Sequence, residues 1–125
     1  MDTICILFVP TNGKTMLAVV DNRLETWQAL VGGYIETDRI VPGVVAIVNE
    51  NGIALNLPLN RNIKNRVYFG DVVFVGYDPG AEDFRSLTPA DCSRLVNAGH
   101  FDEIEATPTS LHWAVSPLKE DGGRK

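Results

Sequence analysis

Short apolar runs alternate with turn-forming residues along most of the chain, and most of these runs predict strands. Residues 3–9 are apolar and rich in β-branched side chains, which predicts a well-buried strand. Asn12-Gly13 then favours a tight turn, because both residues tolerate positive φ. Residues 15–20 predict a second strand, so we expect the chain to begin with a β-hairpin.

The next segment has the apolar spacing of a helix. Its apolar residues fall on one helical stripe: Leu24, Trp27, Leu30 and Val31. Asp21 or Asn22 can cap the first turn, and Asn22 with Glu25 has the spacing of a capping box. Gly32 or Gly33 supplies the left-handed residue that ends the helix.

Further apolar runs predict strands in the middle of the chain. They are residues 34–37, 44–48, 53–57 and 70–77. Val41-Pro42-Gly43 predicts a turn, and residues 49–52 predict a hairpin turn that leads into the 53–57 strand. The strongly apolar 70–77 run predicts a central strand. Residues 61–67 are polar and asparagine-rich, and both a short helix and a long loop fit them.

A second helix is predicted over residues 89–98. Thr88 caps it, Pro89 takes the first helical position, and Asp91 stands three residues after the cap. Gly99 ends it. Residues 111–115 predict a final strand.

These elements predict an α+β fold. We expect a mixed, mainly antiparallel sheet of about five strands, with both helices packed on one face and Trp27 helping to bury it. Residues 1–116 form a single domain in this interpretation, and residues 117–125 form a flexible charged tail.

Composition narrows the functional classes. The 125 residues suffice for one ordinary domain, and the net charge of −5 argues against binding to a polynucleotide. The chain shows no membrane span and no signal-peptide pattern, so we expect a cytoplasmic protein without membrane contact. Cys5 and Cys92 lie in apolar patterns and predict reduced core thiols, with a disulfide unsupported.

Five motifs in order go beyond these patterns. They lie at residues 24–36, at Asn49-Glu50-Asn51-Gly52, at Leu57-Pro58-Leu59-Asn60-Arg61, at residues 70–76 and at Ser86-Leu87-Thr88. Together they resemble the domain of unknown function 3846 family of small phage, plasmid and bacterial proteins, over residues 1–98. The resemblance implies no activity. It implies a setting on mobile elements, often beside accessory genes that handle host defences.

The candidate ligand-binding residues combine polar, cationic and aromatic side chains. They are Tyr34, Glu36, Asn49, Asn60, Arg61, Lys64 and Arg66. Tyr34 and Glu36 share one strand face and can form a polar rim, although a half-exposed strand face explains them equally well. Residues 59–66 form an asparagine-rich segment whose residues 61–66 are a basic island in an acidic chain. Such a segment suits a small anion such as a nucleotide, a protein partner, or a solvated loop with ion pairs.

No residue pattern points to catalysis. His100 and His112 have no neighbouring Ser or Cys of a nucleophilic site, and no metal-ligand spacing appears. We therefore expect no catalytic residue, metal or cofactor. Gly32-Gly33 follows a helix C-terminus, where the dipole repels phosphate, so a helix stop explains the pair better than a phosphate loop.

We expect a non-enzymatic phage or mobile-element binding protein that acts in the host cytoplasm. It would interfere with a host process such as immunity, either by sequestering a nucleotide-type signal or by occluding a host protein. The alternatives are a small enzyme that acts on a nucleotide and a protein-interaction accessory without a small ligand. A homo-oligomer stays open.

Overall fold

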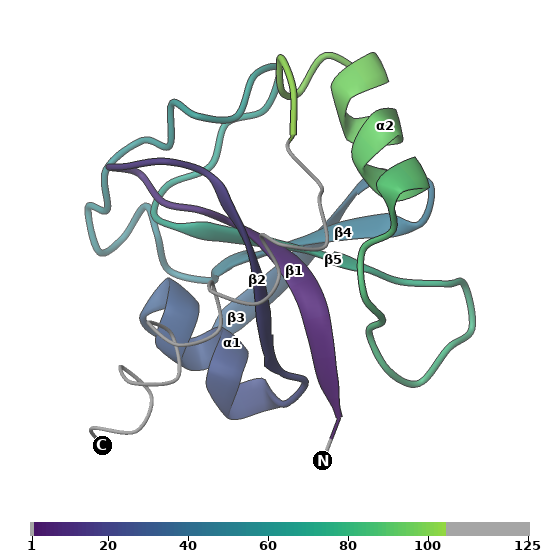
Figure 1. The fold of residues 1–125 in the computed structure, drawn as a ribbon. Helices are drawn as coiled ribbons and strands as arrows, with labels where there is room; N and C mark the ends of the chain where they lie inside the picture. The colour runs from purple at the N-terminus through teal and green to yellow at the C-terminus, as the bar shows by residue number, and fades with distance from the viewer. Residues whose placement is uncertain (1, 105–125) are drawn as a thin grey trace.

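The computed structural model describes residues 2–104, which form a five-stranded sheet with one helix on each face (Figure 1). The elements in chain order are β1 (Thr3–Val9), β2 (Met16–Asp21), α1 (Leu24–Val31), β3 (Ile35–Val41), β4 (Val44–Asn49), β5 (Val72–Gly76) and α2 (Pro89–Asn97). The strand order is β2-β1-β5-β4-β3, and every neighbouring pair is antiparallel. The predicted α+β class is confirmed, although the sheet is wholly antiparallel rather than mixed.

Two hairpins and one inserted strand build the sheet. β1 pairs with β2 and β3 pairs with β4, each across a short turn, and β5 joins the two hairpins by pairing with both β1 and β4. All residues of β4 and β5 are buried. The prediction of a central strand within residues 70–77 is therefore confirmed.

The two helices lie on opposite faces, so the prediction that both pack on one face was wrong. Trp27 and Val31 of α1 join one apolar cluster with Val45 and Val75, whereas Leu95 of α2 belongs to the other cluster. Neighbouring strand residues point to opposite faces. An uninterrupted apolar strand such as β4 therefore needs a cover on both sides.

Helix α1 does not use the predicted capping box. Arg23 occupies the N-cap position, and the structure gives this helix no side-chain cap. The Asn22 side chain instead donates a hydrogen bond to the carbonyl of Phe84 at 3.0 Å, which ties it to the loop before α2. Gly32, with φ of 81°, ends α1 as predicted.

Residues 50–71 form a long connection from β4 to β5, and the predicted strand at 53–57 is absent from it. Residues 51–56 form turns. The Asn49 side chain accepts a hydrogen bond from the Asn51 amide at 2.7 Å, an asparagine turn that directs the chain away from a hairpin return. Residues 61–67 are a loop, which decides between the two conformations that fit the sequence.

Helix α2 follows its sequence signals closely. The Thr88 side chain accepts from the Asp91 amide, Asp91 accepts from the Thr88 amide, and Pro89 stands at the first position, so the predicted capping box is confirmed. Cys5 and Cys92 are free thiols. Neither helix in the described part of the chain is long and apolar enough to span a membrane. The predicted strand at 111–115, the tail at 117–125 and His112 lie outside the described residues.

Gly76, the last residue of β5, provides a direct test of this packing. A Cβ atom there would lie 2.8 Å from both Arg85 Cζ and the Ser86 carbonyl oxygen. We expect Gly76→Ala to lower the free energy of unfolding by about 2 kcal/mol, because the neighbouring backbone must shift to make room. Urea denaturation measures this change, with Ser93→Ala on the exposed side of α2 as the control. Equal midpoints for Gly76→Ala and the wild type would contradict the packing described here.

Candidate functional site

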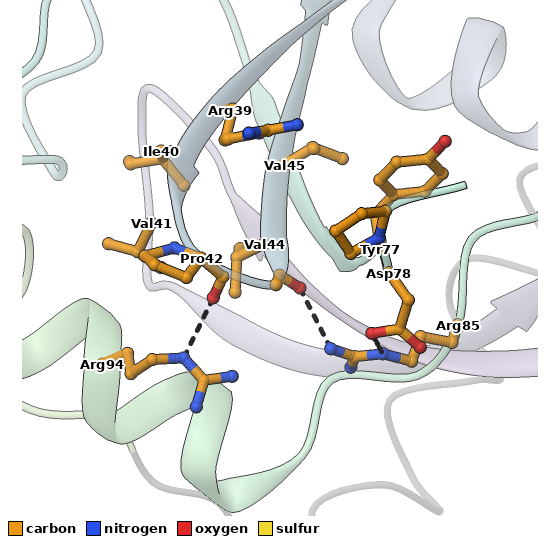
Figure 2. Close-up of a pocket in the computed structure, with 12 residues that line it drawn as sticks. Arg39, Ile40, Val41, Pro42, Val44, Val45, Tyr77, Asp78, Arg85 and Arg94 are labelled. Atoms are coloured by element: carbon orange, nitrogen blue, oxygen red, sulfur yellow. Dashed lines mark hydrogen bonds and ion pairs between the residues drawn. The ribbon is translucent and has the colours of Figure 1, made fainter. Parts of the chain in front are cut away.

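A cleft of about 550 Å³ lies at the end of the sheet where β3 turns into β4 (Figure 2). Its walls come from the β3–β4 turn, from residues 77–79 that follow β5, and from side chains that precede or lie on α2. The charged residues that line it are Arg39, Asp78, Arg85 and Arg94. We call this site the hairpin cleft.

A buried carboxylate stands behind the hairpin cleft. The Asp91 side chain is 0% exposed, on the first turn of α2. It accepts hydrogen bonds from Arg85 Nη1 at 2.6 Å and from the Thr88 amide at 2.8 Å, and it forms an ion pair with Arg94. A buried charge is tolerated only when it is paired and hydrogen-bonded, and these groups supply both.

Arg85 has no donor left for a ligand. Its Nε donates to Asp78, its Nη1 donates to Asp91 and to the Ser86 carbonyl, and its Nη2 donates to Asp91 and to the Gly43 carbonyl. The hydrogen bond to Asp91 is the main reason that the pKa of Arg85 is raised above its ordinary value. Arg85 therefore positions the turn and the helix instead of binding a ligand.

Arg94 uses only part of its guanidinium group in contacts with residues 2–104. Its Nε donates to the Pro42 carbonyl at 3.0 Å (Figure 2), and its Nη2 contacts Asp91, whereas its Nη1 makes no hydrogen bond to residues 2–104. Gly43 makes room for both arginines, because a Cβ there would lie 3.1 Å from a nitrogen of each. With φ of +84°, Gly43 also occupies a conformation that side chains disfavour.

The Asp91 carboxyl stays ionised in this setting. Burial by itself would raise its pKa, but the hydrogen bonds from Arg85 and Thr88 outweigh burial and hold the pKa below the ordinary value of 3.8. The negative charge that holds the two arginines is therefore retained at neutral pH.

Arg39 is the cation of the hairpin cleft whose side chain has no partner within residues 2–104. It is exposed on β3, and its guanidinium makes no hydrogen bond or ion pair within residues 2–104. Its backbone pairs with Val45 of β4 and its carbonyl accepts from Arg66 Nη2 at 3.5 Å, which leaves the guanidinium itself uncontacted by these bonds. Its full set of N–H donors is thus available to a ligand.

Two of the predicted ligand-binding residues hold the backbone together. Asn49 is buried and donates to the Val31 carbonyl at 3.1 Å. Asn60 is buried and donates to the carbonyls of Val9 and Gly70 at 2.8 and 3.2 Å. These amides are already engaged in joining the long connection and the helix end to the strands.

The predicted basic segment is largely neutralised by ion pairs. Lys64 lies 2.5 Å from Asp102, and Arg66 lies 3.3 Å from Asp38 of β3. Arg61 is exposed and has no such partner among the described residues. This arrangement matches the solvated loop with ion pairs that the sequence left open, more than an anion site.

Tyr34 and Glu36 are exposed at the start of β3. The walls of the hairpin cleft contain none of the seven predicted residues. The cleft residues were missed because Arg39 carries no local signal and because Asp91 already had an explanation as a helix cap. The available sequence signal was the Pro42-Gly43 turn, which follows Arg39 closely in the chain.

A second surface feature lies on the connection between β4 and β5. Four large aliphatic side chains are exposed there: Ile53 (76%), Leu55 (57%), Leu59 (40%) and Val67 (72%). Leu59 pairs with Phe69 in an isolated β-bridge, and Gly52 packs closely against the same Phe69, so the two ends of the connection fold back on each other. We call these four residues the apolar loop surface.

Comparison with known proteins gives one match. The family described as "Domain of unknown function (DUF3846)" matches residues 3–100. No curated protein and no solved structure matches the chain.

Asp91 yields a test of the network behind the cleft. We expect Asp91→Asn to lower the free energy of unfolding by about 3 kcal/mol at pH 7, because two arginines lose their buried partner. The pKa of Asp91 is lower in the folded state, so its contribution is complete above its ordinary value of 3.8 and is lost as the pH falls below it.

The same denaturation series over pH 2–7 should therefore show the wild type and Asp91→Asn converging in acid. Asp83→Asn, in the exposed loop before α2, is the matched control and should change stability little. A constant difference between the wild type and Asp91→Asn at every pH would rule out the ionised carboxylate as its source.

Proposed function

The chain belongs to the DUF3846 family, and we propose that it is a non-enzymatic binding protein of a phage or other mobile element. In this proposal it acts in the host cytoplasm and interferes with a host process such as immunity. The favoured mode is occlusion of a host protein by the apolar loop surface.

The exposure of the apolar loop surface is the observation that supports this mode. When a partner covers exposed aliphatic side chains, each Å² of apolar surface removed from water contributes about 25 cal/mol to the free energy of binding. Single exposed aliphatic residues are ordinary, but four large ones are exposed on this one connection. Ile53 and Leu55 lie two residues apart in one turn segment, so two large apolar side chains that could anchor a partner are close together in the sequence.

Charge indicates the chemistry of the partner. The chain carries a net charge of −5, and the exposed Glu50 and Glu36 flank the start of the connection and the neighbouring strand, whereas the exposed Arg61 lies between Leu59 and Val67 at its other end. Complementary charge speeds encounter and excludes wrong partners. We therefore propose a host protein with an apolar patch bordered by lysine and arginine, such as a nucleic-acid-binding protein.

Capture of a nucleotide-type signal is the second candidate mode. The guanidinium of Arg39 at the hairpin cleft, which has no partner within residues 2–104, favours it, whereas the pairing of Lys64 and Arg66 moves the expected ligand away from residues 61–66. A small enzyme that acts on a nucleotide is the alternative for the same ligand class.

The apolar loop surface is tested by replacing its two most closely spaced anchors. We expect Ile53→Ser with Leu55→Ser to weaken binding to the host partner by about tenfold or more, as for anchors at the centre of an interface. The partner is identified by affinity capture from host lysate and then titrated, after purification, against each variant.

Leu24→Ser is the matched control, because Leu24 is 52% exposed on α1, outside the surface. All three substitutions affect exposed side chains, so thermal unfolding should stay close to that of the wild type. If the double variant and Leu24→Ser bind the purified partner as tightly as the wild type, the apolar loop surface is not the interface.

A further inference from the structure

We infer that the hairpin cleft binds a nucleoside phosphate, whose phosphate is held by Arg39 and whose base lies toward Val45 and Tyr77. This inference rests on the second mode of the proposed function, ligand capture, and gives it a place and a ligand class. It involves none of the residues that the sequence singled out for ligand binding.

Register in the sheet places the three residues together. Arg39 is the cross-strand neighbour of Val45, and Val45 is the neighbour of Val75 on β5. Tyr77 follows Val75 by two residues and so faces the same side. Figure 2 shows the Arg39 guanidinium extending across β4 toward Val45, with the ring of Tyr77 beyond it.

The side chain of Tyr77 is held in place by a hydrogen bond and a ring contact. The Tyr77 hydroxyl donates to the Ala81 carbonyl at 3.0 Å, and its ring meets Phe84 edge to face at 6.1 Å between centroids. Its backbone amide donates to the Gly43 carbonyl at 2.9 Å. A ring held in this way offers a preformed apolar wall, which lowers the cost of ordering when a base binds.

The charge of the cleft favours an anion. Three guanidinium groups line the cleft, and the carboxylate of Asp78 is already bound to Arg85 Nε at 2.9 Å. Asp91 is buried between Arg85 and Arg94. The balance is one positive charge, carried by Arg39, which has no internal partner within the described residues.

Chemistry then selects the ligand. A guanidinium presents a planar fork of donors that matches two phosphate oxygens at once. The volume of about 550 Å³ falls within the range of sites that hold small organic ligands, and its lining includes the apolar residues Val45 and Pro79. A phosphate alone would leave this apolar lining unused, and a base alone would leave Arg39 unused.

The competing explanation is that Arg39 only keeps the edge strand β3 from pairing with other sheets, as exposed charges on edge strands do. Binding measurements separate the two explanations, because an edge charge would bind every anion weakly and without regard to the base.

The test uses the purified full chain and the four ribonucleoside 5′-monophosphates, followed by isothermal titration. We expect at least one of them to bind, and its nucleoside and ribose 5-phosphate to bind at least about tenfold more weakly. Arg39→Ala should lose about tenfold in affinity, and Arg39→Lys should lose part of that, since it keeps the charge but not the fork.

Arg61→Ala is the matched control, because Arg61 is also exposed and without an internal partner in the described region but lies on the β4–β5 connection. Arg61→Ala and the double variant of the apolar loop surface should bind the nucleotide as the wild type does. Since no host protein is present, failure of this inference is distinct from failure of the occlusion mode.

Two outcomes would overturn the inference. One is that none of the four nucleotides binds. The other is that Arg39→Ala and Arg61→Ala weaken binding equally. The bound ligand is also released by heat and chromatographed: an intact nucleotide supports capture, and an altered one shows that the cleft is catalytic and overturns the non-enzymatic proposal.

Discussion

The buried carboxylate of Asp91 is the interaction on which the arrangement around the β3–β4 turn depends. With no exposure to water it must be paired, and it is paired with Arg85, which precedes α2, and with Arg94, which lies on α2. Both arginines also bind carbonyls of the turn, so one charge holds α2 against the hairpin. This arrangement also requires glycine at positions 43 and 76. A side chain at either Gly43 or Gly76 would meet Arg85.

This network also divides the cations of the chain by role. Arg85 uses every donor internally, and Lys64 and Arg66 are paired with acidic residues, so these groups hold the chain in shape. Arg39 and Arg61 make no such contact within residues 2–104. The proposed binding residue is thus a cation left without an internal partner in the described residues after folding, and it lies outside the segment with the highest local density of positive charge.

Features that depend on residues close together in the chain, such as the ends of α2, were predicted from the sequence. Helix α2 was predicted almost to its ends because Thr88, Pro89 and Asp91 mark its start and Gly99 directly follows its last turn. The errors share a different cause: Asn22 bonds to Phe84, which lies 62 residues away, and Asn60 bonds to Val9 across 51 residues. The same holds for the site, since only the register of three strands and a helix brings Arg39 into the hairpin cleft.

The two candidate sites are far apart at one end of the connection and close together at the other, where Arg66, the neighbour of Val67, donates to the Arg39 carbonyl at 3.5 Å. The apolar loop surface belongs to the connection that leaves β4 at Asn49, whereas the hairpin cleft surrounds its start at Val44. A strand of six residues spans roughly 20 Å at about 3.3 Å per residue. A nucleotide in the cleft would therefore be distant from a protein that covers Ile53 and Leu55, but not from one that covers Val67. Arg66 lies between the two sites at that point, because its guanidinium pairs with Asp38 and reaches the Arg39 carbonyl, so the Val67 end is where the two proposed binding modes would influence each other.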